Sequence, residues 1–193
     1  MGLDLRRYHR QSIRLRGYDY TQNGAYFVTA CTWQKECIFG HIENGMMIPS
    51  ELGNIVNEYW YQLPDHFPNV ALDEFAIMPN HVHGILAIVG PVGAGLPRPY
   101  KATTQHKPTL GQIVGYFKYQ STKRINTLRA TPGLPFWQRN YYEHIIRNER
   151  ELERIREYIV NNPAKWEMDV ENPAVMQKSD VTQKSDFSHH KTR

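Results

Sequence analysis

The chain has 193 residues, of which 40% are hydrophobic, and this is enough for one packed domain of moderate size. Its formal net charge of +4 is compatible with a polyanionic partner but does not require one. The two cysteines exclude a disulfide-rich scaffold, and no apolar run reaches the roughly 20 residues of a membrane span. The first residues lack the apolar segment of a signal peptide, so we expect a soluble, cytoplasmic protein without a membrane partner.

Residues 1–20 are expected to form a basic N-terminal arm in which arginines are interleaved with tyrosines. Nucleic-acid-binding surfaces use this mixture, because arginine pairs with phosphate and tyrosine offers a face on which bases stack. A solvated arm without any partner has the same composition, so the stretch alone does not decide between them. The arginines that could contact a nucleic-acid backbone are Arg6, Arg7, Arg10, Arg14 and Arg16.

The next segments predict a strand, a hairpin and a helix. Residues 25–32 are rich in β-branched and aromatic side chains, which favours a central strand. Within residues 38–48, Asn44-Gly45 is typical of a tight hairpin turn. Ser50 is a suitable N-cap for a helix whose apolar residues recur at helical spacing until Pro64.

The motif His81-Val82-His83 opens the most apolar run of the chain, directly after Pro79-Asn80. Side chains two residues apart in a strand point the same way, so both imidazoles can reach one metal ion while Val82 packs on the other face. Two core histidines hydrogen-bonded to their neighbours are the competing interpretation. Residues 70–78 form a second apolar run, and the short turn between the runs predicts antiparallel neighbours.

After a flexible loop at 90–107, the sequence predicts two more helices, one capped by Thr109 and one over 148–162. On the second of these, Tyr158 and Asn162 are four residues apart and share one face. If that face packs near His81 and His83, the amide oxygen of Asn162 and the phenol of Tyr158 lie close to the two imidazoles. Alternatively, Tyr158 is a boundary residue and Asn162 merely ends the helix. We expect one domain over 21–170, followed by a disordered polar tail at 171–193.

Four sequence blocks recur together in a known family. They are Gly-Ala-Tyr-Phe-Val-Thr from Gly24, Met-Pro-Asn-His-Val-His-Gly-Ile from Met78, Trp-Gln-Arg-Asn-Tyr-Tyr-Glu-His-Ile-Ile-Arg from Trp137, and Tyr-Ile-Val-Asn-Asn-Pro from Tyr158. With these four blocks in this order, the chain resembles the single-tyrosine transposases of the HUH endonuclease superfamily, in particular the REP-associated tyrosine transposases and their insertion-sequence-200-like relatives. The resemblance implies an α+β fold, with an antiparallel β-sheet and helices packed on one face, ferredoxin-like.

The resemblance also implies roles for individual residues. His81 and His83 become metal ligands, Asn162 the third ligand, and Tyr158 the nucleophile. Many of the insertion-sequence relatives carry Gln where this chain has Asn162. The ligand types suit Mg²⁺ or Mn²⁺, with Mn²⁺ the better match to nitrogen, and they also accommodate zinc. The rival nucleophiles are Tyr119, Tyr141 and Tyr142.

The implied function is metal-dependent cleavage and rejoining of single-stranded DNA at hairpin-forming, REP-like sequences through a 5′-phosphotyrosine intermediate. Such a protein would work as a monomer or homodimer and associate with the nucleoid when bound to DNA. The alternatives are a catalytically silent, domesticated nucleic-acid-binding protein of the same fold and a metal-dependent hydrolase without a covalent step. Trp137 could stack on a base or belong to the core. The candidate DNA contacts beyond the arm are Lys118, Lys123, Arg124, Arg139, Tyr141 and Arg147.

Overall fold

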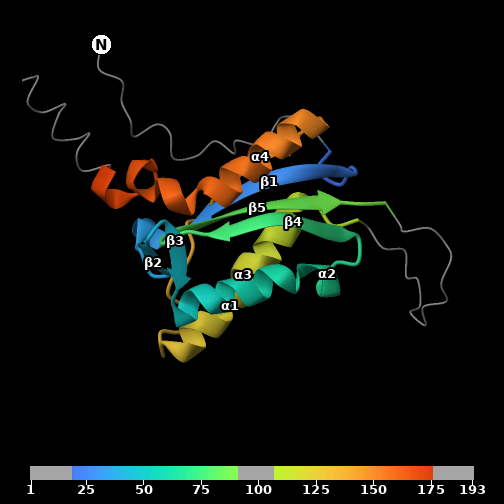
Figure 1. Ribbon diagram of the computed structural model, residues 1–193. Helices are drawn as coiled ribbons and strands as arrows, with labels where there is room; N and C mark the ends of the chain where they lie inside the picture. The colour runs from blue at the N-terminus through green and yellow to red at the C-terminus, as the bar shows by residue number, and fades with distance from the viewer. Residues whose placement is uncertain (1–18, 91–106, 176–193) are drawn as a thin grey trace, which may run out of the picture.

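The computed structural model describes residues 19–90 and 107–175 of the chain, and Figure 1 shows their arrangement. A four-stranded sheet in the order β4-β5-β1-β6 forms the centre of the domain, and all its neighbouring strands are antiparallel. Its strands are β1 (Gly24–Cys31), β4 (Val70–Ile77), β5 (His81–Ile88) and β6 (Tyr142–Ile146). A separate hairpin consists of β2 (Gly40–Glu43) and β3 (Met46–Pro49), with Asn44 and Gly45 at its turn.

The helices begin where the sequence places capping side chains. The Ser50 side chain accepts a hydrogen bond from the backbone of Gly53, and Thr109 forms a capping box with Gln112. The Asn148 side chain caps the last long helix by accepting a hydrogen bond from the backbone of Glu151. The helices are α1 (Glu51–Tyr61), α2 (Leu63–His66), α3 (Leu110–Leu128) and α4 (Glu149–Asn161), and short 3₁₀ turns cover Trp33–Lys35 and Pro163–Met168.

The order of the elements confirms the predicted ferredoxin-like α+β fold. Helix α1 connects β1 to β4, and α3 connects β5 to β6, which gives a βαββαβ arrangement with one added hairpin. Both helices lie on the same face of the sheet, as the family resemblance implied (Figure 1). Helix α4 is different, because it lies on the opposite face (Figure 1). The expectation of helices on one face therefore describes α1 and α3 but not α4.

Alternation along the central strands divides the core into two parts. Tyr26, Val82 and Leu86 point toward α1 and α3 and belong to the larger cluster, which includes the fully buried Trp60. Phe27 and Ile85 point the other way and form a smaller cluster with Ile159 of α4. The smaller cluster holds α4 against the face of the sheet that carries the odd-numbered residues of β5, and His81 and His83 are among these.

The described residues extend beyond the predicted domain boundary at 170. Asn172 is buried, its side chain donates to the carbonyl of Trp166, and Glu171 contacts several residues near β5. The arginines of the predicted arm, the greater part of the predicted loop at 90–107 and the tail from residue 176 lie outside the described residues. Within the described residues, no helix has both the length and the apolar character needed to cross a bilayer.

Candidate active site

His81 and His83 lie side by side on the face of β5 that α4 covers. Both side chains are buried, and their Nε2 atoms are 3.0 Å apart. Val82 between them belongs to the larger core cluster on the opposite face. Strand alternation therefore places the two imidazoles together, as the spacing predicted.

Hydrogen bonds at the Nδ1 atoms orient both rings. The Nδ2 group of Asn80 donates to the carbonyls of Lys35 and Glu171, so the Oδ1 atom of Asn80 is free to accept from Nδ1 of His81 at 2.8 Å. Nε2 of neutral His81 then carries a lone pair rather than a proton. On the neighbouring strand β1, the hydroxyl of Thr29 lies 2.8 Å from Nδ1 of His83. This arrangement leaves the Nε2 atoms of the two rings facing each other.

Burial keeps both imidazoles neutral. It lowers the pKa of His83 to about 3, and burial together with the neighbouring His83 lowers the pKa of His81 to about 2. A neutral imidazole is the form that binds a metal ion. The pair is therefore in the protonation state that metal binding needs at physiological pH.

Helix α4 brings Tyr158 to the histidines from a distant part of the sequence. The buried Ile159 anchors this turn of the helix, and the Tyr158 ring packs edge-on against Phe27. The Tyr158 hydroxyl lies 3.4 Å from Nε2 of His83, yet 46% of the residue is exposed, so a substrate can approach it. Burial and the charge of Asp169 raise the pKa of Tyr158, while a hydrogen bond with Asn162 lowers it. The net direction is upward, so Tyr158 is a neutral phenol at physiological pH.

Asn162 ends α4 one turn after Tyr158 and is also buried, with 3% of the residue exposed. Its Oδ1 atom is buried without a hydrogen-bond partner. Leaving a buried acceptor without a hydrogen bond costs about 1–3 kcal/mol of stability, and coordination of a cation by this oxygen would offset that cost. The donor set of two neutral imidazoles and an orphaned amide oxygen thus fits a divalent metal ion.

Asp169 belongs to the same cluster, although the sequence analysis did not identify it. Its Oδ2 atom lies 3.9 Å from Nε2 of His81, and the ligand atoms of His81, His83 and Asp169 all lie within 4.8 Å of one another. The only available signal was a carboxylate soon after the helix that carries Tyr158. That signal is too common to indicate a site, because the turns over 163–172 decide where the carboxylate lies.

The structure separates the rival tyrosines. Tyr119 is exposed on α3, on the other side of the sheet, and Tyr141 packs half-buried against the larger core cluster. Tyr142 does lie on the same face as the histidines, edge-on to Phe27, because it pairs with Thr29 in the sheet. Among the described tyrosines, Tyr158 is the one whose hydroxyl contacts the histidine pair.

Two of the predicted DNA contacts interact with other parts of the domain. The Lys118 ammonium donates to the carbonyls of Gln138, Arg139 and Asn140, at 2.6, 3.1 and 3.4 Å, and burial lowers its pKa to about 8. It therefore holds the chain before β6 and is not a free cation for phosphate. Tyr141 is half-buried and packs against the larger core cluster.

The remaining candidates lie apart from the histidines. Trp137 is buried, and its Nε1 group donates to the hydroxyl of Ser121, so it belongs to the core. Lys123 and Arg124 are exposed on α3, across the sheet from the site. Arg139 is exposed before β6, and Arg147 is exposed after β6, at the end remote from Tyr142. The structure does not gather these cations around Tyr158.

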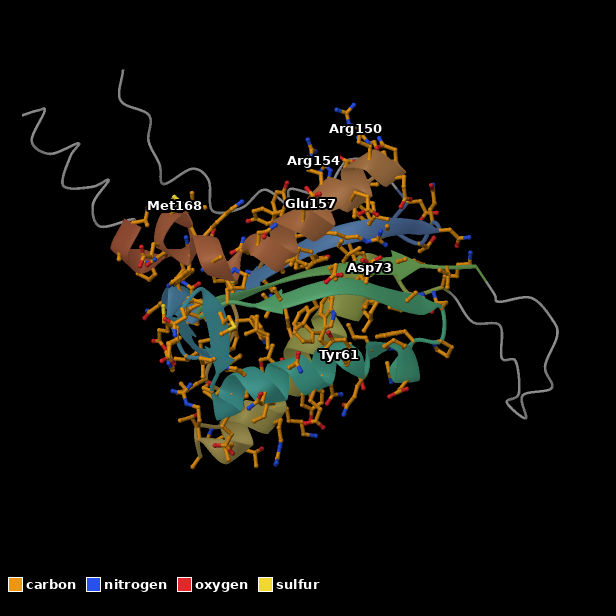
Figure 2. The ribbon with its side chains drawn as sticks, viewed as in Figure 1. Tyr61, Asp73, Arg150, Arg154, Glu157 and Met168 are labelled. Carbon is orange, nitrogen blue, oxygen red and sulfur yellow. The ribbon has the colours of Figure 1, made fainter. Side chains whose placement is uncertain are left out.

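A partly exposed ion pair also holds α4 against the sheet. Arg156 donates from Nε and Nη2 to the two carboxylate oxygens of Asp73, which lies in the irregular part of β4. Figure 2 shows Asp73 on the side of the sheet that α4 covers, whereas Arg150, Arg154 and Glu157 lie on the outer surface of the helix. The Arg156–Asp73 pair thus contributes to the position of the helix that carries Tyr158 and Asn162.

The stabilisation from this pair should depend on pH. The hydrogen bond from Arg156 is the main cause that lowers the pKa of Asp73 below its usual 3.8. The stabilisation is therefore fully present above about pH 4 and is lost as the pH falls through the lowered folded-state value. We expect Asp73→Asn to lower the melting temperature at about pH 7, with the difference from the parent protein shrinking below about pH 3. Circular dichroism melts of both proteins measure this, with the exposed Glu74→Gln as control; a difference that does not change with pH would contradict it.

Comparison with known proteins identifies two relatives of the chain. No known protein-family model matches it. It is 46% identical, over 171 residues, to an uncharacterised protein of Haemophilus influenzae, and the match covers 84% of this chain and 92% of that protein. A second Haemophilus influenzae protein, provisionally named a REP-associated tyrosine transposase, is 22% identical over 160 residues, which cover 76% of this chain and 74% of that one.

A solved structure extends the comparison to the fold. The structure of a REP-associated tyrosine transposase bound to a REP hairpin matches with a TM-score of 0.53 and 19% identity, covering 80% of this chain and 74% of that chain. This match agrees with the antiparallel sheet and helices described above. The chain therefore belongs to the same family as the 46% identical Haemophilus influenzae protein, and in sequence and fold it resembles the REP-associated tyrosine transposases.

Proposed function

We propose that this protein is a metal-dependent tyrosine transposase, which cleaves and rejoins single-stranded DNA at hairpin-forming, REP-like sequences through a 5′-phosphotyrosine intermediate. The observation that carries the proposal is the position of the Tyr158 hydroxyl, 3.4 Å from Nε2 of the buried His83. Tyr158 is 75 positions away from His83 in the sequence, so the fold alone creates this contact. The likeness to a transposase bound to a REP hairpin supports hairpin DNA as the partner.

His81, His83 and Asn162 would hold the divalent cation. The facing Nε2 atoms and the orphaned Oδ1 of Asn162 are suitable donors for Mg²⁺ or Mn²⁺, and the two nitrogen ligands favour Mn²⁺. When bound, such an ion polarises the oxygens of the scissile phosphate and neutralises charge on the departing oxygen. The hydrogen bonds of the imidazoles with Asn80 and Thr29 keep the rings in the required orientation.

Tyr158 supplies the nucleophile of the exchange reaction. Its phenol oxygen attacks the phosphorus, a new bond from tyrosine to phosphorus forms, and the bond from phosphorus to the 3′-oxygen breaks. The phenol proton passes to water, which reaches the half-exposed side chain, and the departing 3′-oxygen gains a proton from water. The phosphoester is exchanged rather than hydrolysed, so a 3′-hydroxyl can later attack the phosphotyrosine and rejoin the strand without ATP.

One chain contains all the residues of the proposed site. Tyr158 contacts His83 of its own chain, and Asn162 lies one turn further along the same helix. We therefore propose that the site is assembled in cis and that a monomer can cleave DNA, whether or not the protein also forms a homodimer. Such an activity would place the protein in the cytoplasm, at the nucleoid.

The proposal predicts a covalent protein–DNA adduct. The full chain is incubated with Mn²⁺ and single-stranded oligonucleotides that carry imperfect palindromes from the DNA around its own gene, each with unpaired flanks. We expect a product that survives denaturing electrophoresis, and EDTA should abolish it because the ion is removed. DNA binding that persists in EDTA, without an adduct or cleavage in Mn²⁺, would show a silent binding protein. Cleavage without an adduct would show a hydrolase, and either result would overturn the proposal.

A further inference from the structure

Asp169 lies where an additional ligand of the proposed cation site would be. Its Oδ2 atom is 3.9 Å from Nε2 of His81, within a cluster of ligand atoms no more than 4.8 Å apart. Its side chain is 7% exposed. It also forms a hydrogen bond with the side chain of Asn162, the residue whose Oδ1 atom has no partner. The carboxylate therefore borders the same space as the three proposed ligands.

Local hydrogen bonds aim this carboxylate at the histidines. Oδ1 of Asp169 accepts from the backbone N–H of Glu171 at 2.7 Å, which leaves Oδ2 to face His81. Glu171 is itself fixed, because its carbonyl accepts from Asn80 at 2.7 Å and its carboxylate pairs with Lys35 at 2.8 Å. The Asn80 side chain that orients His81 thus also anchors the turn that orients Asp169. One network determines the positions of both groups.

The charge of the site gives this carboxylate a chemical role. Two neutral imidazoles and an amide would leave the charge of a divalent ion wholly uncompensated. A carboxylate would compensate one unit of it, and a set of imidazole, amide and carboxylate ligands suits Mn²⁺ and related ions. In return, the ion would offset the free-energy cost of keeping a carboxylate mostly out of water.

We infer that Asp169 is an anionic fourth ligand of the cation held by His81, His83 and Asn162. The inference rests on the metal site of the proposed function, but not on DNA cleavage. Asp169→Asn tests it, because the amide keeps the size of the side chain and an acceptor for the Glu171 N–H but removes the charge. Glu167→Gln is the matched control, since Glu167 is exposed two residues earlier.

The experiment measures Mn²⁺ binding to the full chain without DNA. The electron paramagnetic resonance signal of free Mn²⁺ gives the dissociation constant, and the visible absorption of Co²⁺ reports the ligand set. We expect Asp169→Asn to weaken Mn²⁺ binding by roughly tenfold or more and to change the Co²⁺ spectrum, while Glu167→Gln stays within about twofold of the parent protein. Melting curves in EDTA check that each variant folds. If Asp169→Asn does not fold, Asp169→Glu, which retains the charge, should bind Mn²⁺ more tightly than Asp169→Ala.

The outcomes separate this inference from the proposed function. Unchanged Mn²⁺ binding and an unchanged Co²⁺ spectrum in folded Asp169→Asn would overturn it, even if the parent protein forms the DNA adduct. Failure of the parent protein to bind Mn²⁺ would overturn it as well. If Mn²⁺ binding depends on Asp169 but no adduct forms with DNA, the ligand assignment stands and the cleavage proposal fails.

Discussion

Tyr158→Phe should abolish the covalent protein–DNA adduct and reduce strand cleavage by at least about a thousandfold, because it removes the attacking oxygen. The substitution deletes one atom and keeps the ring that packs edge-on against Phe27. The helix should therefore stay in place, and hairpin binding should remain within about twofold of the parent protein. Adduct formation is followed on denaturing gels, and binding is followed by electrophoretic mobility shift.

Two other tyrosines provide the matched controls for this experiment. Tyr142→Phe removes a hydroxyl on the same face of the sheet, and Tyr119→Phe removes one on the opposite side. Both variants should form the adduct at rates within about threefold of the parent protein. An adduct in the Tyr158→Phe protein, or its loss in the Tyr142→Phe protein, would show that the nucleophile has been misassigned.

Gly84→Ala should destabilise the domain by about 1–3 kcal/mol, which corresponds to a fall of several degrees in melting temperature. Gly84 follows His83 in β5 and faces the larger core. A Cβ atom at this position would lie 2.3 Å from one ring atom of Trp60 and 2.6 Å from another. The Trp60 indole is fully buried and stacked on Phe75, with ring centroids 4.6 Å apart, so it has little room to move.

Gly115→Ala is the control for this prediction. A Cβ atom on Gly115 would meet nothing within 4 Å, and alanine favours a helix over glycine by about 1 kcal/mol, so this variant should be slightly more stable. Chemical denaturation of both proteins measures the difference. If Gly84→Ala lowers the free energy of unfolding less in the Trp60→Leu protein than in the parent protein, the indole is the group that clashes, because the effects of substitutions at contacting residues are not additive. Equal stability of Gly84→Ala and the parent protein would contradict the packing argument.

Sequence reasoning reached the main elements of the fold because their signals are local. Capping side chains at Ser50 and Thr109 mark helix starts that the structure confirms, and the helix predicted over 148–162 begins at Glu149, with Asn148 as its N-cap. The hairpin turn at Asn44-Gly45 and the two antiparallel runs around Pro79-Asn80 are also confirmed. The position of α4 was not predictable in this way. The apolar stripe of that helix shows that it packs on one side, but it does not show which face of the sheet receives it.

The same limit applies to the cationic residues. In the sequence, Lys118 is a candidate phosphate contact because it is a lysine on the polar side of a predicted helix. Only the packed structure shows that its ammonium is bound to three carbonyls of the chain before β6. Likewise, the sequence alone does not show whether Trp137 stacks on a base or packs in the core, and its burial in the structure shows that it packs in the core.

Residue spacing alone established that His81 and His83 share one face of a strand and that Tyr158 and Asn162 share one face of a helix. Both statements depend on the fixed periods of regular backbone, which any short segment carries with it. Only the tertiary structure brought the two faces together, left Oδ1 of Asn162 without a partner, and added Asp169 from an irregular turn. These contacts join residues more than 70 positions apart, and they depend on which sheet face α4 covers and on the network around Asn80 and Glu171. Backbone periodicity carries no information about either.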